Sequence, residues 1–78
     1  MLVQDEALRA KIEQIAREEM GEFLDGVEFR PPYEDEDLVI IVQLKKYPED
    51  FEQRNRKLLR RVRSLGYDIG VLVDYPEE

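Results

Sequence analysis

The chain contains no cysteine and no histidine. Without cysteine, disulfide bonds and thiolate metal sites are excluded. Without histidine, the commonest zinc ligand and the usual general base are also missing. Zinc hydrolases and nucleophilic triads are therefore excluded, and any metal would have to be held by hard oxygen ligands such as carboxylates.

Long apolar runs are also missing. The apolar segments are far shorter than the roughly 20 residues that a membrane-spanning helix needs. The beginning of the chain, MLVQDEALRA, lacks the charged-then-apolar pattern of a signal peptide. With 42% hydrophobic and 40% charged residues, the composition is typical of a folded domain rather than a disordered segment. We expect a cytoplasmic protein with no membrane partner.

At 78 residues, the chain has the length of one small domain covering residues 1–78. A chain this short buries only about 60% of the surface that its unfolded form exposes. Small domains are commonly reinforced by disulfides, by a metal or by a partner. Because disulfides are excluded, regular packing, an oxygen-ligated metal or a partner must supply the stability.

The net charge of −7 is unevenly distributed. Residues 45–63 contain eight of the twelve basic residues but only three of the nineteen acidic ones, so this segment carries +5 and the remainder −12. An acidic chain disfavours general binding to nucleic acids. The basic segment has three interpretations: solvated or paired with acidic residues of the first helix, a surface for an acidic protein, or a surface for RNA. Its side chains are Arg54, Arg56, Lys57, Arg60, Arg61 and Arg63.

Hydrophobic periodicity predicts five elements. Apolar residues recur at helical spacing in 5–20 and in a second helix that begins at Pro48, a residue suited to the first helical position. Alternating apolar and polar residues predict strands over 23–30 and 67–75. Residues 37–44 are apolar on both faces, as in a central strand covered on both sides.

The order α-β-β-α-β predicts an α+β fold. The short proline-containing turn favours an antiparallel first pair of strands, and a strand-helix-strand unit favours a parallel crossover. We expect a three-stranded mixed sheet with both helices packed on one face. Val39, Ile41 and Leu72 then lie on the opposite face, where an apolar patch usually marks an interface. This predicts a homodimer, or a complex with another protein.

Four consecutive acidic residues, 34–37, precede the most apolar strand. Residues two apart in a strand share a face, so Asp35 and Asp37 project together, and Asp68 lies at the same edge if the last strand runs parallel. Three carboxylates at one edge suit magnesium. The alternative is a solvated turn whose charges discourage edge-to-edge aggregation.

The stretch DEDLVIIVQL, a charged helix and LGYDIGVLVDYPEE resemble the minimal nucleotidyltransferase fold over residues 35–78. This resemblance implies that Asp35 and Asp37 form the metal-binding pair and that Asp68 is the third carboxylate. The family's Gly-Ser phosphate-binding motif is absent, so the resemblance implies a degenerate domain. The element order is also similar to that of KH-like RNA-binding domains, although their Gly-x-x-Gly loop is absent. The favoured hypothesis is a non-catalytic interaction domain without a cofactor.

Overall fold

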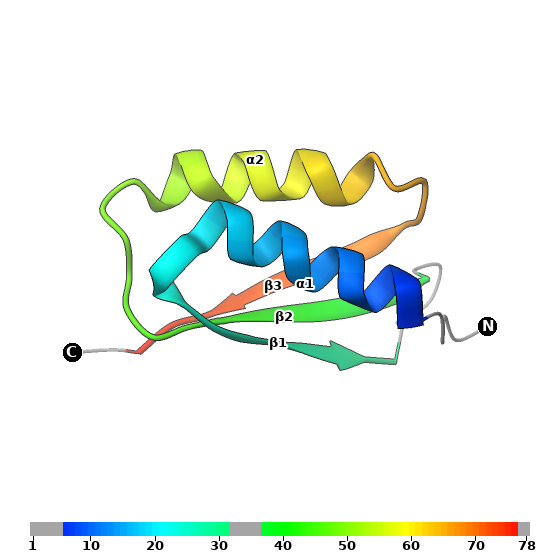
Figure 1. Ribbon diagram of the computed structural model, residues 1–78, viewed down its shortest axis with the longest axis horizontal. Helices are drawn as coiled ribbons and strands as arrows, with labels where there is room; N and C mark the ends of the chain where they lie inside the picture. The colour runs from blue at the N-terminus through cyan, green and yellow to red at the C-terminus, as the bar shows by residue number, and fades with distance from the viewer. Residues whose placement is uncertain (1–5, 32–36, 77–78) are drawn as a thin grey trace.

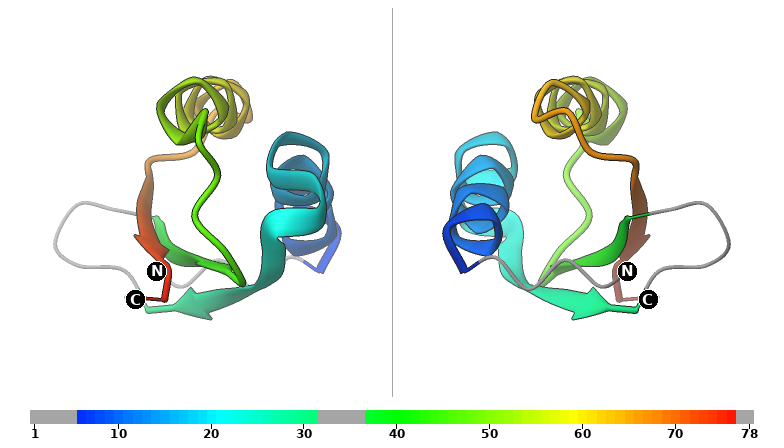
Figure 2. Two further views of the ribbon diagram at one scale, coloured as in Figure 1. Left: turned by 90° about the vertical axis from the view of Figure 1, so that its left-hand side faces the viewer. Right: turned by 90° about the vertical axis from the view of Figure 1, so that its right-hand side faces the viewer.

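The structure, a computed structural model, describes residues 6–31 and 37–76 and consists of two helices over a three-stranded sheet (Figure 1). Both helices lie on the same side of the sheet (Figure 2). This arrangement confirms the predicted α+β fold and its order α-β-β-α-β. The elements are α1 (Glu6–Met20), a single 3-10 turn (Gly21–Phe23), β1 (Leu24–Arg30), β2 (Leu38–Leu44), α2 (Phe51–Arg63) and β3 (Ile69–Asp74).

The strands lie in the order β1-β2-β3, with β2 in the centre. Strand β1 pairs with β2 antiparallel, and Phe29 lies opposite Ile40. Strand β3 pairs with β2 parallel, and Val71 lies opposite the same Ile40. The mixed sheet predicted from the sequence is therefore confirmed, and α2 forms the crossover between the two parallel strands.

The hydrophobic core lies between the helices and one face of the sheet. Alternate residues of β2 point toward the helices, and all four are at most 5% exposed: Leu38, Ile40, Val42 and Leu44. The helices contribute a continuous apolar stripe to the same core: Leu8, Ile12, Ile15, Ala16 and Met20 from α1, and Leu58 and Val62 from α2. The outer strands complete this layer with partly buried residues. Neither of the two described helices lies on the opposite face of the sheet.

Helix α2 begins three residues later than the sequence predicted. Pro48 is buried and precedes the helix, and its carbonyl oxygen accepts a hydrogen bond from the Phe51 backbone N–H at 3.2 Å. Asp50 has backbone angles of φ −96° and ψ 32°, which are outside the helical range. The proline therefore closes a turn that leads into the helix rather than occupying its first position. Strand β3 is likewise shorter than predicted, because Tyr67 and Tyr75 lie outside it.

Candidate functional site

The face of the sheet turned away from the helices presents three residues from each strand. In an extended strand alternate side chains point to opposite faces, and the pairing register places these nine residues in three rows. The rows, read from β1 across β2 to β3, are Arg30, Val39 and Gly70; Glu28, Ile41 and Leu72; and Gly26, Gln43 and Asp74. We call this array the outer face.

All three residues predicted to form an interface lie on the outer face, but their exposure differs. Leu72 is 55% exposed, the largest value among the exposed large hydrophobic residues of the described chain. Ile41 lies directly beside it in the register and is half-buried. Val39 is only 3% exposed and is already covered within a single chain. The open apolar area is therefore centred on Ile41 and Leu72.

Polar side chains lie beside this apolar centre on β1 and at one end of the face. On β1, the Arg30 guanidinium pairs with the Glu28 carboxylate, and both side chains are about half exposed. At the opposite end of the face, Gln43 of β2 lies beside Asp74 of β3. Polar groups beside an apolar centre are common at protein–protein interfaces.

The structure brings together two of the three aspartates predicted to hold a metal. The Asp37 carboxylate accepts a hydrogen bond from the Asp68 backbone N–H at 2.9 Å, and the Asp37 backbone N–H donates to the Asp68 carbonyl oxygen at 2.7 Å. These two bonds join the segments that lead into β2 and β3 and continue their parallel pairing by one step. Asp35 lies outside the described residues.

Replacing Asp37 tests this structural role. We expect Asp37→Ala to lower the free energy of unfolding by roughly 0.5–1.5 kcal/mol, because the Asp68 N–H loses its side-chain acceptor. Asp37→Asn keeps an acceptor oxygen and should lose less. Urea denaturation of the three proteins measures the difference, and equal losses in both variants would contradict the assigned hydrogen bond.

Within residues 6–31 and 37–76, no group of three or more acidic side chains is placed to hold a metal ion. The third predicted ligand, Asp35, lies outside these residues. Magnesium binding by the acidic cluster stays a prediction, which a melting-temperature titration with magnesium and manganese would test. A metal that binds only the folded chain must raise the melting temperature.

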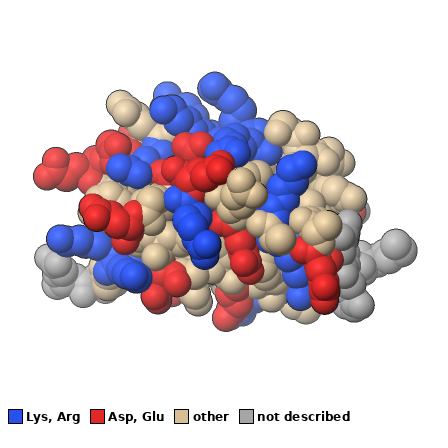
Figure 3. Space-filling model, in the orientation of Figure 1, with Lys and Arg blue, Asp and Glu red and all other residues tan. Residues whose placement is uncertain are grey.

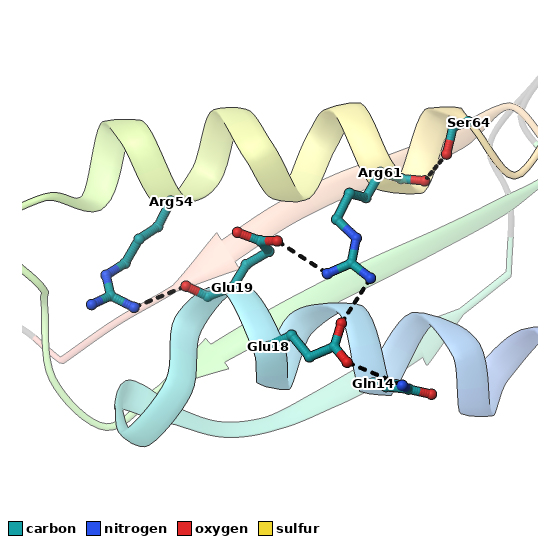
Figure 4. Close-up of polar contacts among 6 residues, drawn as sticks. All are labelled: Gln14, Glu18, Glu19, Arg54, Arg61 and Ser64. Atoms are coloured by element: carbon teal, nitrogen blue, oxygen red, sulfur yellow. Dashed lines mark hydrogen bonds and ion pairs between the residues drawn. The ribbon is translucent and has the colours of Figure 1, made fainter.

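Two of the six predicted basic-surface residues connect α2 to α1 (Figure 4). The Arg61 guanidinium forms ion pairs with Glu18 at 2.7 Å and Glu19 at 3.0 Å. Arg54 donates a hydrogen bond to the Glu19 carbonyl oxygen at 2.9 Å, and its guanidinium carbon lies 5.0 Å from the centre of the Phe23 ring. These contacts match the interpretation in which the basic helix pairs with the acidic first helix.

The contact between the helices has a measurable electrostatic consequence. A hydrogen bond from the Gln14 side chain, and then the Arg61 guanidinium, hold the pKa of Glu18 below its ordinary value. We expect Arg61→Gln to raise the Glu18 pKa only part of the way toward its ordinary value, because the hydrogen bond from Gln14 remains. The double variant Arg61→Gln with Gln14→Ala should restore the ordinary pKa. Carboxyl-carbon NMR titration of the wild type and both variants measures this.

The sign of the pH dependence follows from the lowered pKa. The stabilising contribution of Glu18 is complete above the ordinary glutamate pKa of about 4.3 and is lost as the pH falls through the lowered value. Because the side chains of Arg61 and Glu18 are 41% and 46% exposed, we expect this part of the acid dependence to be small and to weaken with salt. An unchanged Glu18 pKa in Arg61→Gln would contradict the ion pair.

The other four residues of the predicted basic surface are exposed on α2: Arg56, Lys57, Arg60 and Arg63. In the orientation of Figure 3, Lys and Arg side chains gather along the upper edge of the molecule, over α2. Acidic side chains of the molecule lie below them in the same view. The sequence located this basic surface, but only the structure separates its exposed residues from those bound to α1.

Of the helices that the structure describes, none combines the length and apolarity required to cross a membrane. Comparisons of the chain with protein-family models, curated proteins and solved structures found no match. Its function must therefore be inferred from the geometry of its own surfaces.

Proposed function

We propose that the chain is a small, non-catalytic interaction domain that self-associates as a homodimer through the outer face. The observation that carries this proposal is the side-by-side placement of Ile41 and Leu72 on the face of the sheet opposite both described helices. Leu72 is 55% exposed, whereas the core side chains are at most 8% exposed. An exposed apolar centre with polar groups beside it favours a protein partner over water.

Burial of Leu72 would supply a direct part of the binding free energy. Fully burying a leucine side chain contributes about 1.5–3 kcal/mol relative to leaving it exposed. From standard strand spacings, three strands and three rows span roughly 15 by 20 Å. Two such faces amount to roughly 600 Å² in total, which is below the roughly 1,000 Å² of a stable specific interface, so we expect a weak dimer that forms only at high micromolar concentration.

Sedimentation velocity over a concentration series tests the proposal. The wild type should shift from monomer to dimer as its concentration rises, and Leu72→Ser should remain a monomer over the same range. Tyr67→Ser is the matched control, because Tyr67 is 38% exposed but lies outside β3 and its outer row. A wild type that stays monomeric up to several hundred micromolar would refute self-association.

A further inference from the structure

We propose that the outer edge of β3 is a second self-association surface, on which β3 pairs antiparallel with β3 of another copy of this chain. The two sheets then form one continuous sheet of six strands. This contact is separate from the packing of outer faces in the proposed homodimer, and it enlarges the area available to that packing.

The sheet has two edges, one on β1 and one on β3. Among the described strands, each of these two pairs only with β2. The open edge of a strand presents backbone N–H and C=O groups, to which a strand of another chain can bind. Proteins usually protect such an edge with charged side chains, with a β-bulge or with proline.

Strand β1 carries all three kinds of protection. Asp25, Glu28 and Arg30 are charged, and Pro31 follows the strand directly. The pairing register with β2 shifts at Asp25, as at a β-bulge. We therefore expect no strand to add to the edge of β1.

Strand β3 has none of these protections over residues 69–73. This segment, IGVLV, contains no charged residue and no proline, and its register with β2 continues without a shift. Leu72 is 55% exposed on the outer face, and Val71 and Val73 are only partly buried on the helix side. The residues of β2 in the same inner layer are at most 5% exposed, so β3 is open on both sides of its edge. An open, apolar edge without charges is a predicted site of pairing with another chain.

The partner that fits this edge is a second copy of β3, because the strand is complementary to itself. A two-fold antiparallel pair centred on Leu72 places Leu72 beside Leu72 of the other copy and Val71 beside Val73. It also sets Asp74 opposite an uncharged residue. A pair centred on Val71 instead sets Asp74 opposite Asp68, and like charges directly opposite each other are destabilising. We therefore expect the pair to be centred on Leu72.

Edge pairing also makes the outer-face contact large enough to be stable. A two-fold axis perpendicular to the sheet leaves both outer faces on the same side, where they adjoin through the Leu72 side chains. Two of these six-stranded sheets packed on each other bring four outer faces together, roughly 1,200 Å² in total. This area exceeds the roughly 1,000 Å² of a stable specific interface. The two contacts therefore support each other, and the complete assembly is a tetramer.

A lysine on the edge of β3 tests the pairing. Natural edge strands are protected by lysine and by charged side chains that point inward. Val71→Lys should therefore remove the tetramer at concentrations where the wild type forms it. The matched control is Val27→Lys, because Val27 is a partly buried valine of the same layer on β1 and should leave the tetramer intact. Sedimentation velocity measures the species, and circular dichroism with thermal melting establishes that both variants are folded.

Disulfide formation provides a second test, because the chain has no cysteine of its own. Directly opposite residues of an antiparallel pair have Cα atoms about 4.5–5.5 Å apart, which a disulfide can span. A mixture of Val71→Cys and Val73→Cys should therefore form disulfide-linked heterodimers on mild oxidation. Neither variant alone should do so, because its two cysteines would lie two residues out of register, with Cα atoms more than about 7 Å apart. Packing of outer faces alone cannot link these cysteines, since both residues lie on the helix side of the sheet.

The outcomes separate edge pairing from the proposed function. Leu72 takes part in both contacts, whereas Val71 belongs only to the edge and Ile41 only to the outer face. A wild type that stays monomeric throughout the concentration series refutes both contacts. A wild type that stops at a dimer, with no disulfide in the cysteine mixture, refutes edge pairing and leaves the outer-face homodimer.

The opposite result would support edge pairing alone. In that case the cysteine mixture forms its disulfide, and Ile41→Thr, which changes only the outer face, leaves self-association as in the wild type. Disulfide formation in Val71→Cys by itself would place the axis on Val71 and overturn the register proposed here.

Discussion

Leu58→Ala should lower the free energy of unfolding by about 2–5 kcal/mol. The Leu58 side chain is fully buried, with 0% exposure, and belongs to the core between α2 and the sheet. Truncation removes its burial and leaves a cavity that the surrounding side chains fill only in part. Domains of ordinary stability unfold with only about 5–15 kcal/mol, so the loss is a large share of the total.

Urea denaturation followed by circular dichroism measures this effect at a protein concentration low enough to keep the chain monomeric. The matched control is Gln53→Ala, an exposed position of the same helix, which should change the stability by less than about 0.5 kcal/mol. A loss below about 1 kcal/mol for Leu58→Ala would mean that α2 is not packed on the sheet as the structure shows.

The fold could be predicted because its local patterns agree with one another. The segment 37–44 is apolar on both faces, which identified the central strand before any pairing was known. The regular spacing of Leu8, Ile12 and Ile15 identified the buried side of α1. Both patterns are regular recurrences of apolar residues over a short stretch of chain, so they can be read from a single sequence.

The ends of elements were predicted less accurately because they depend on contacts made elsewhere. Pro48 suits a first helical position, yet its burial and the turn to Phe51 place the start of α2 later. The side chain of Asp50 pairs with Arg54 at 2.7 Å while its backbone stays outside the helical range. Helix propensity alone does not distinguish a helix that begins at Pro48 from one that begins at Phe51.

The candidate site could be predicted only in part. Strand alternation placed Val39, Ile41 and Leu72 on one face, but it did not show that Val39 is covered and Leu72 is open. The rows that place Ile41 directly beside Leu72 require the pairing register, which is a property of the folded sheet. The same limit applies to Arg54 and Arg61, whose partners lie on a helix more than 30 residues away in the chain.

Gly66→Ala should lower the free energy of unfolding by about 1–2 kcal/mol, because Gly66 has a left-handed backbone with φ of 89°. A Cβ added at this position would meet no described atom within 4 Å, so the expected loss comes from the backbone and not from a steric clash. The glycine follows the C-cap of α2, Ser64, by two residues and turns the chain toward β3. Its conformation therefore sets the direction in which the parallel strand begins.

A series at this one position distinguishes backbone strain from lost packing. Asparagine tolerates left-handed angles better than alanine, and β-branched residues tolerate them least. We therefore expect stability to fall in the order glycine, asparagine, alanine, valine, as measured by urea denaturation. A packing defect would instead follow side-chain volume and make Gly66→Asn worse than Gly66→Ala. An unchanged stability in Gly66→Ala would mean that the turn relaxes to ordinary angles, and the link from α2 to β3 would then not depend on glycine.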